Sequence, residues 1–220
     1  MLDSNMFKPF SFQIALFFGP DFNLQPLAIA TLIKDKLGSM FSVEPSTIPY
    51  PPNAPIPLEA PKVILQGDSN GQIIVSSLRA DLILNLKSEV SLEQKLSDFV
   101  CDFADCFENA KIVRLGCIIQ FDMEKDAIEV IRENYIKEGK LVDAKELYVG
   151  WLKKMKIVNL DSNRIVNFAS NSMNGSICGR LMVDSNTVPE NMLDLKGNDI
   201  KEYVAACILQ AKGDFNVFVE

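Results

Sequence analysis

Two arginines and one glutamine are the residues of this sequence that are best placed to bind a ligand. Arg114 and Gln120 fall on the polar face of the predicted strand KIVRLGCIIQF, and Arg180 shares a face with Asp184 on a later predicted strand. A guanidinium can hold a carboxylate or a phosphate through two parallel hydrogen bonds. If both strands belong to one sheet, the two arginines can meet and grip one anion, so Arg114, Gln120 and Arg180 are the candidate ligand-binding residues. The alternative is that each arginine is solvated or pairs with a neighbouring carboxylate.

Histidine, the residue that most often exchanges protons near neutral pH, does not occur in the sequence. Its absence excludes Ser-His-Asp and Cys-His catalysis and histidine-ligated metals. The acidic pairs Asp102/Asp105 and Glu124/Asp126 fall on the surface or at the start of predicted helices, and nothing marks them as general acids. Other groups can replace histidine only in a perturbed environment. Enzymatic activity therefore stays open, and the sequence favours a protein without turnover.

The five cysteines show no C-x2-C spacing of the kind that zinc and redox sites use. Cys117 and Cys207 fall on predicted apolar faces, Cys106 lies beside one, and Cys101 lies toward the polar face of its helix. This pattern predicts buried, unreactive thiols, with Cys101 as the most reactive of them. We therefore expect no metal site and no cofactor.

Hydrophobic periodicity predicts the elements of the first half. Alternation from Phe10 to Phe18 indicates a strand, and the next apolar stripe indicates a helix that begins near Pro26 and ends at Gly38. A capping box at Ser91 begins a second helix. Between the two helices lie a strand at 63–66 and a long alternating stretch at 72–86, which gives the order β-α-β-β-β-α.

The alternating stretch is longer than an ordinary strand. A three-residue loop would preserve its alternation, so we predict a hairpin whose tip is Arg79-Ala80-Asp81. On this interpretation the two charged residues are exposed turn residues and do not form a buried site. The DSN triplets that begin at Asp68, Asp161 and Asp184 also predict turns, because Asp and Asn side chains can bond to their own backbone.

The second half repeats this plan with one extra helix. A strand at 111–121 precedes a helix that ends at Gly139, and a second helical stripe runs from Ala144 to Met155 with Trp151 at its centre. Strands at 156–160, 164–169 and 176–183 follow, and a last helix ends at Gly213. We expect Trp151 to be largely buried against the sheet of this half.

The repeated order predicts an α+β fold of two similar lobes. Each lobe is expected to hold mostly antiparallel sheet with helices on one face, in a duplicated β-α-β-β-β-α plan that resembles the TATA-binding or ferredoxin-like folds. The predicted domains are residues 1–109 and 110–220. Seven of the eleven prolines fall in residues 45–61 and predict an extended crossover. The bare P-x-x-P pattern that begins at Pro49 leaves an SH3-like partner as the alternative.

The net charge of −7 limits the partners of the chain. Nucleic-acid binders use a basic surface to replace counterions, so this charge disfavours nucleic acid, including DNA held by a duplicated saddle. Lys153, Lys154 and Lys156 form the nearest approach to a basic run, and at the end of a predicted helix they complement the helix dipole. No apolar run reaches the ~18 residues of a membrane span, and the first segment does not resemble a signal peptide. We expect a cytoplasmic protein without a membrane partner.

The segments VILQGDSNGQIIVSSLRADLILNL and KIVRLGCIIQF resemble a sporadically distributed family of uncharacterised bacterial proteins. In that family a hairpin and a helix precede a strand with an R-x-G-L-R-Y-x-N-like core. The matching residues are Gly71, Arg79 and Asn85, followed by Arg114-Leu115-Gly116, and Cys117-Ile118-Ile119 stand where the family has Leu-Arg-Tyr. The resemblance implies the same hairpin, helix and strand order and a bacterial protein, and it implies no particular activity.

Two functions remain as hypotheses. The first is a protein that acts by binding another protein, as an inhibitor, an immunity-type protein or a regulator, because an acidic surface can complement a basic partner. The second is a protein or enzyme that binds a small anionic ligand, such as a nucleotide, on the open side of a sheet through Arg114, Gln120 and Arg180. The sequence specifies no oligomeric state.

Overall fold

A computed structural model describes residues 7–38, 41, 43–51, 53, 55–67, 71–86, 92–136, 147–173, 176–190 and 193–214. Over these ranges the fold is α+β, as predicted, with a nine-stranded antiparallel sheet and four helices. In chain order the elements are β1 (Lys8–Phe18), α1 (Pro26–Leu37), β2 (Ser46–Thr47), β3 (Val63–Gln66), β4 (Gly71–Val75), β5 (Arg79–Asn85), α2 (Leu92–Asp105), β6 (Ile112–Met123), α3 (Ala127–Tyr135), β7 (Tyr148–Ile157), β8 (Leu160–Met173), β9 (Ser176–Thr187) and α4 (Gly197–Asp214).

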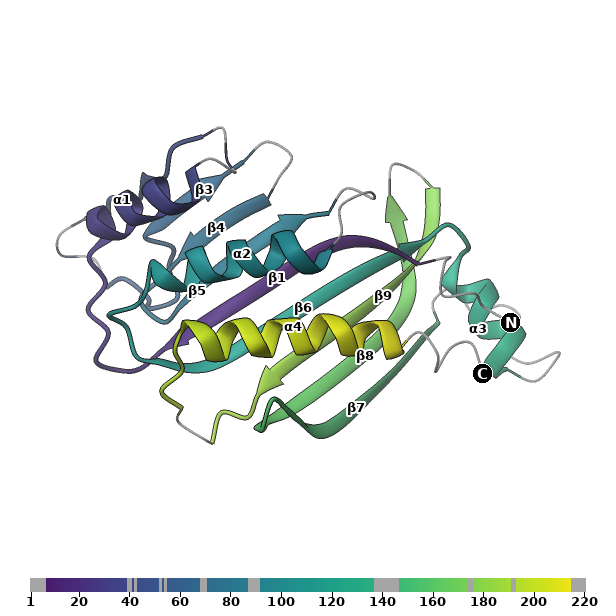
Figure 1. Ribbon diagram of the computed structural model, residues 1–220. Helices are drawn as coiled ribbons and strands as arrows, with labels where there is room; N and C mark the ends of the chain where they lie inside the picture. Colours follow the sequence, from purple (N-terminus) through teal and green to yellow (C-terminus); the bar gives the residue numbers. More distant parts are fainter. Residues whose placement is uncertain are drawn as a thin grey trace.

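Strands β1 and β6 lie at the centre of the sheet (Figure 1). The strand order is β2-β3-β4-β5-β1-β6-β9-β8-β7, so strands from the first half of the chain fill one side and strands from the second half fill the other. β1 and β6 pair antiparallel, from Lys8 opposite Asp122 to Phe18 opposite Ile112, with a register shift between Pro9 and Ser11. The division into lobes at 1–109 and 110–220 stays a prediction.

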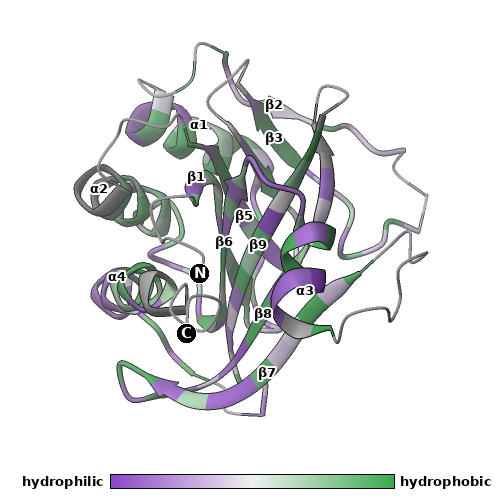
Figure 2. Ribbon diagram, turned by 90° about the vertical axis from the view of Figure 1, so that its right-hand side faces the viewer, coloured by the Kyte–Doolittle hydropathy of each residue, from purple (hydrophilic) through white to green (hydrophobic). Residues whose placement is uncertain are grey.

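Helices α1, α2 and α4 cover one face of the sheet, as Figures 1 and 2 show. The even-numbered residues of β1 from Phe12 to Phe18 point toward these helices and are buried, as are Val100 of α2 and Ile200 of α4. One cluster of buried apolar side chains runs through both halves of the chain. We call the opposite side of the sheet, which α1, α2 and α4 do not cover, the open face.

The apolar stripes predicted for α1, α2 and α4 face the core, except at Leu32 of the predicted α1 stripe, which is exposed. α1 begins at Pro26, buries Ile29, Ile33 and Leu37, and ends before Gly38. The other two stripes are buried at Leu96, Val100 and Phe103 in α2 and at Ile200, Val204, Cys207, Ile208 and Ala211 in α4. The predicted capping box at Ser91 and the predicted helix end at Gly139 lie outside the described residues.

The hairpin between β4 and β5 turns earlier along the chain than predicted. Ser76 N donates to Arg79 O at 2.9 Å, and the Ser76 hydroxyl accepts hydrogen bonds from the backbone N–H groups of Leu78 and Arg79. Arg79 and Asp81 are therefore strand residues, and Asp81 is only 4% exposed, so the prediction of an exposed hairpin tip is wrong. The turn inverts the alternation, because the buried apolar residues are odd-numbered in β4 and even-numbered in β5. The run Ile73-Ile74-Val75 has apolar side chains on both faces, which conceals the inversion.

Strand β7 occupies most of the segment for which the sequence predicts a second helix. Trp151 lies half-buried in this edge strand, so the predictions of a helix and of a largely buried Trp151 are wrong. The two-residue turn Val158-Asn159, with φ values of 47° and 64°, joins β7 to β8 in the manner of a type I′ hairpin. Trp151 and Met155 point to the helix side, whereas Tyr148 and Leu152 are exposed on the open face. Apolar residues on both faces of the strand imitate the spacing of a helical stripe.

Two DSN triplets lie inside strands, so the turns predicted there are wrong. Asp161-Ser162-Asn163 belongs to β8 and Asp184-Ser185-Asn186 belongs to β9, whereas Asp68 lies outside the described residues. Ser162 and Ser185 are buried. Ser162 Oγ accepts a hydrogen bond from the Tyr203 hydroxyl of α4 at 3.3 Å, and Ser185 Oγ accepts one from Arg164 Nη1 at 3.1 Å. Polar partners for the two serines in the core therefore overcome the turn preference of the Asp and Asn residues beside them.

The proline-rich segment forms an irregular connection between β2 and β3. Ile48 N donates to Lys62 O at 2.9 Å, and the Tyr50 hydroxyl donates to Pro61 O at 2.7 Å, so the two ends of the connection are held together. Pro52, which completes the P-x-x-P pattern, lies outside the described residues. Within the described parts of the chain, no helix combines the length and the apolar character that crossing a membrane requires.

Candidate functional site

The register of the central strands brings the predicted ligand-binding residues to the open face. Alternate residues along each strand point to this face, and pairs such as Gln13–Ile118 fix the rows across it. The rows contain Arg79, Asp81, Ile83 and Asn85 from β5, Ser11, Gln13, Ala15 and Phe17 from β1, Arg114, Gly116, Ile118, Gln120 and Asp122 from β6, and Arg180, Met182, Asp184 and Asn186 from β9. Arg114, Gln120 and Arg180 thus share one surface.

Hydrogen bonds across the strands hold several polar side chains of the open face in place. Ser11 Oγ donates to Gln120 Oε1 at 3.0 Å, which joins β1 to β6. Gln13 Nε2 donates to Asp81 Oδ1 at 3.0 Å, which joins β1 to β5. Because these groups bond to one another, the surface is preorganised and a partner would meet fixed side chains. Gln120 is one of these fixed groups, and its role as a ligand-binding residue stays a prediction.

Arg180 lies at one end of the open face and is bound to a neighbouring carboxylate. Its Nε donates to Asp122 Oδ1 at 2.6 Å and its Nη2 donates to Asp122 Oδ2 at 2.9 Å. Its guanidinium carbon also lies 4.0 Å from the centre of the Phe10 ring. This is the pairing with a neighbouring carboxylate that the sequence leaves open as the alternative. The charge of Arg180 is therefore balanced within the chain.

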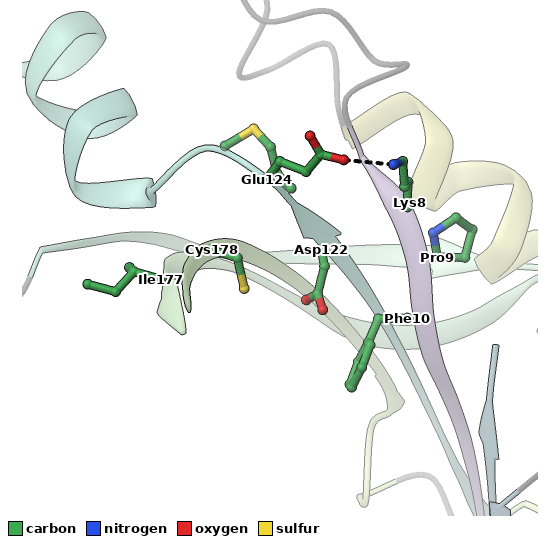
Figure 3. Close-up of a pocket in the computed structure, with 8 residues that line it drawn as sticks. Lys8, Pro9, Phe10, Asp122, Glu124, Ile177 and Cys178 are labelled. Atoms are coloured by element: carbon green, nitrogen blue, oxygen red, sulfur yellow. Dashed lines mark hydrogen bonds and ion pairs between the residues drawn. The ribbon is translucent and has the colours of Figure 1, made fainter. Parts of the chain in front are cut away.

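A pocket of about 440 Å³ opens beside Asp122, the carboxylate of this ion pair. Asp122 and Phe10 line it on one side, and Ile177 and Cys178 line it on the other (Figure 3). Lys8, Pro9, Met123 and Glu124 complete the lining. Lys8 Nζ and Glu124 Oε1 form an exposed ion pair of 2.9 Å at the rim, drawn as a dashed line in Figure 3. The pocket thus combines apolar walls with charges that are already paired.

Cys178 places a thiol in this pocket. Desolvation raises the pKa of the Cys178 thiol, the negative charge of Asp122 raises it further, and the positive charge of Arg180 opposes both. The thiolate is the nucleophilic form of cysteine, so at neutral pH Cys178 is protonated and weakly reactive. The thiol therefore contributes a small apolar surface to the pocket.

Arg114 lies at the other end of the open face and contacts an aromatic ring. Its guanidinium carbon is 4.7 Å from the centre of the Phe17 ring, and the guanidinium carbon of Arg79 is 5.8 Å from the same centre. Arg79 Nε is bound to Asp81 Oδ2 at 2.8 Å. The Nε atom of Arg114 is buried and has no hydrogen-bond partner among the described residues. Arg114 is thus a cation supported by an aromatic ring, and part of its hydrogen-bonding capacity is unused.

The two arginines do not meet, so the prediction that they hold one anion together is wrong. Arg180 pairs across the strands with Asp122, which lies eight positions beyond Arg114 along β6. At ~3.3 Å per residue this separation is roughly 26 Å, which is far longer than two guanidinium side chains can bridge. The two arginines therefore lie far apart along the strand direction, although their strands, β6 and β9, are neighbours in the sheet.

Two carboxyl groups of the open face were not singled out as site residues from the sequence. Burial raises the pKa of Asp81, whereas the charge of Arg79 and the hydrogen bond from Gln13 lower it. Burial also raises the pKa of Asp184, whereas the hydrogen bond from Asn186 and the charge of Arg114 lower it. The sequence signal for Asp81 was its place inside an apolar alternating run, where a charged residue requires a partner.

Burial suppresses the reactivity of Cys106 and Cys117. Desolvation raises the pKa of the Cys106 thiol to about 12. Cys117 of β6 and Cys207 of α4 are buried next to each other, and their mutual hydrogen bond together with desolvation raises the pKa of Cys117. Cys101 is half-exposed. Among the residues that the structure describes, there is no group of three or more cysteine and acidic side chains that could hold a metal ion.

Comparisons with protein-family models, with curated proteins and with solved structures found no match to this chain.

Proposed function

We propose that the protein works by binding another protein, and that the pocket lined by Phe10, Ile177 and Cys178 receives an apolar side chain of that partner. The observation that carries this proposal is the combination of an apolar pocket with a rim of paired charges. Interface hot spots commonly consist of such an anchor in a desolvated pocket, surrounded by polar groups that exclude water.

The size of the pocket supports this reading. About 440 Å³ is within the range of sites that accept small molecules or large side chains. Ile177 is 60% exposed on its wall, which leaves apolar area to be covered by a partner. The ion pairs Lys8–Glu124 and Arg180–Asp122 leave no unbalanced charge among the described residues that line the pocket. An uncharged, apolar occupant therefore fits better than an anion.

The chemistry of the pocket favours binding over turnover. The thiol of Cys178 has a raised pKa, and the carboxylates of Asp122 and Glu124 are bound to Arg180 and Lys8. Acid–base catalysis near neutral pH requires a group whose pKa lies close to that pH. These pocket side chains are better suited to holding a partner than to exchanging protons with it.

Photocrosslinking tests this proposal. Ile177 is replaced by p-benzoylphenylalanine in the native cell, and Leu209, which is 68% exposed on α4, carries the same replacement as a matched control. We expect a crosslinked protein from position 177 that is absent from position 209 and that mass spectrometry identifies. Once the partner is identified, the Ile177→Asp variant should no longer bind it, whereas the Leu209→Asp variant should still bind it. Equal crosslinking from both positions would overturn the proposal.

A second candidate function is favoured by the unused hydrogen-bonding capacity of Arg114. A carboxylate or phosphate could bind there as a ligand supported by the Phe17 ring. Nucleotides and other anionic metabolites are added while the melting temperature is followed. A ligand at a hundred times its dissociation constant stabilises by ~2.7 kcal/mol, a shift of several degrees. Binding at this site predicts a shift that is lost in Arg114→Ala and kept in Lys111→Ala, which removes a nearby exposed charge.

We also propose that the two halves of the chain are two copies of one β-α-β-β-β-α plan. The strand order supports this, because β1 pairs with β5 of its own half and β6 pairs with β9 of its own half. The last helix of each half, α2 and α4, lies on the same face of the sheet (Figure 1). Superposition of an experimental structure of residues 1–109 on residues 110–220 tests the proposal, and unrelated backbone paths would contradict it.

A further inference from the structure

Strand β7 forms one edge of the sheet and is long enough to bind an extended segment. It spans ten residues, and among the described residues no strand pairs with its outer side. Peptides commonly bind such edges by adding a strand, because the unpaired backbone groups provide hydrogen bonds. The opposite edge of the sheet, β2, has only two residues and is too short for this purpose.

The turn that joins β7 to β8 determines which backbone groups of β7 point outward. A type I′ hairpin closes on a pair that exchanges both hydrogen bonds, which here is Ile157 with Leu160. The pattern then alternates, so odd-numbered residues of β7 bond to β8 and even-numbered residues direct their N–H and C=O groups away from it. The outward residues are Tyr148, Gly150, Leu152, Lys154 and Lys156.

An independent hydrogen bond agrees with this assignment. Asp161 lies opposite Lys156 in the β7–β8 pair. Its carbonyl oxygen accepts from Val188 N at 2.9 Å, on the β9 side of the strand. The backbone carbonyl of Asp161 therefore points away from β7, and the backbone groups of Lys156 face outward.

The side chains of β7 give this edge a distinct chemistry. Its second half contains Lys153, Lys154 and Lys156, and the strand contains no acidic residue. Lys156 is 3.6 Å from Asp161, whereas Lys153 and Lys154 form no ion pair with described residues. Its first half exposes Tyr148 and Leu152 on the open face. The edge is thus basic at one end and apolar at the other, in a chain whose net charge is −7.

These charges distinguish between two possible occupants. In a fully overlapping antiparallel pairing of two copies of this chain through β7, the lysines of one copy would lie opposite the uncharged residues 148–152 of the other and would meet no carboxylate. An acidic segment has the opposite sign and meets complementary charges. Antiparallel pairing matches the rest of the sheet and is slightly the more stable arrangement.

We infer that β7 binds an extended acidic segment of a partner protein as a tenth, antiparallel strand. The segment has carboxylates in its first half, opposite Lys153, Lys154 and Lys156, and apolar side chains in its second half, opposite Tyr148 and Leu152. This inference does not depend on the pocket, and Ile177→Asp should leave binding at β7 unchanged.

A synthetic peptide provides the probe. It has nine residues, with glutamates at the first, third and fourth positions and Thr or Val elsewhere. Trp151 is the chain's one tryptophan and lies in β7, so its fluorescence reports binding directly. Hydrogen exchange followed by NMR identifies the mode: the amides of Leu152 and Lys154 should exchange fast in the free chain and become protected in the complex. The amides of Trp151 and Lys153 should be protected in both states.

Three controls separate the contribution of backbone hydrogen bonds to peptide binding from the contribution of charge. Lys154→Pro removes an outward N–H without removing a bond to β8, and it should weaken binding by at least about tenfold. Lys154→Ala keeps that N–H and should cost only about two- to fivefold. The same peptide with N-methylated amides on the side that faces β7 should not bind.

The reversal of charge keeps the test decisive if the proline variant does not fold. The triple variant Lys153→Glu/Lys154→Glu/Lys156→Glu should lose the glutamate peptide and bind its lysine counterpart. The inference is overturned if the Leu152 and Lys154 amides are already protected in the free chain, because the edge is then occupied. It is equally overturned if a saturating peptide leaves these amides unprotected.

Discussion

Arg180 and Asp122 face each other across β9 and β6 and form a two-point ion pair, with Nε 2.6 Å from Oδ1 and Nη2 2.9 Å from Oδ2. Both side chains are largely removed from water, at 21% and 17% exposure. The Phe10 ring lies against the guanidinium and completes its surroundings. Arg180, which the sequence offers as a ligand-binding residue, therefore helps to hold the neighbouring strands β6 and β9 together beside the pocket.

Breaking this pair should destabilise the protein. Asp122→Ala leaves the Arg180 guanidinium partly buried without its carboxylate, and we expect a loss of about 1.5–3 kcal/mol in the free energy of unfolding. Urea denaturation measures this loss. Glu124→Gln breaks the exposed Lys8–Glu124 pair nearby and should have no measurable effect. Equal effects of the two variants would show that the two-point geometry and burial of the Arg180–Asp122 pair add nothing to the free energy of unfolding.

Asp81 should make stability depend on pH in an unusual direction. Burial raises the pKa of this carboxyl above its ordinary value of 3.8, although Arg79 and Gln13 oppose the shift. The folded state then binds the proton more tightly than the unfolded state, so the free energy of unfolding falls as pH rises from below 3.8 through the raised pKa. Relative to Asp81→Asn, the wild type should lose stability over this window in urea titrations at stepped pH. A gain in stability instead would mean that the charge of Arg79 outweighs burial and lowers the pKa of Asp81.

Gly71 should tolerate no side chain. Its φ is +132°, and a Cβ atom there would lie 1.9 Å from the carbonyl oxygen of Ile83 on the paired strand. Gly71→Ala should cost more than the ~1–3 kcal/mol of backbone strain alone, because β4 and β5 must also move apart. Gly38→Ala is the matched control, since Gly38 has ordinary helical angles and its nearest neighbour would be 3.9 Å away. Thermal unfolding of both variants compares them, and similar melting temperatures would contradict this account.

Trp151 and Phe168 should differ in their contribution to stability. Trp151 is half-buried on the edge strand, so Trp151→Ala should cost about 1–2 kcal/mol, which is part of the value for a fully buried side chain. Phe168 on the neighbouring β8 is fully buried, and Phe168→Ala should cost ~3–5 kcal/mol. Chemical denaturation gives both values. A larger loss of stability for Trp151→Ala than for Phe168→Ala would indicate that another segment covers β7 and buries Trp151.

Alkylation should separate the cysteines by their burial. Cys101 and Cys178 are half-exposed, whereas Cys106, Cys117 and Cys207 are buried. With iodoacetamide at neutral pH we expect the two half-exposed thiols to be modified first, Cys178 slowly because of its raised pKa. The buried thiols should react only when the protein unfolds, as mass spectrometry of the native and denatured protein will reveal. Early modification of Cys207 would show that α4 detaches readily from the sheet.

Elements with a single buried face could be predicted from the sequence. β1, β6 and the stripes of α1, α2 and α4 each face one common core, so their periodicity is unambiguous. Segment 148–157 was predicted wrongly because an edge strand can expose apolar side chains such as Leu152 on one face and half-bury Trp151 on the other. Local periodicity contains no information about which strand lies at an edge, since sheet order depends on contacts distant in sequence.

For the candidate site, the sequence predicts only which face of the sheet each residue occupies. Alternation correctly assigns Arg114, Gln120 and Arg180 to the open face. It cannot show that Asp122 binds Arg180, because that contact depends on the register between β6 and β9. The buried Asp81 was missed for the same reason, since its partner Gln13 comes from a strand 68 residues away in sequence.

The central position of β1 has a consequence for how the chain is made. One of its two pairing strands is β6, and bonded residues such as Ser11 and Gln120 are 109 residues apart in sequence. At the usual rate of translation, β1 leaves the ribosome roughly 5–20 s before β6 does. During that time one hydrogen-bonding edge of an aromatic-rich strand, including Phe12 and Phe18, has no native partner. The nascent chain should therefore complete the centre of its sheet only after β6 has been synthesised.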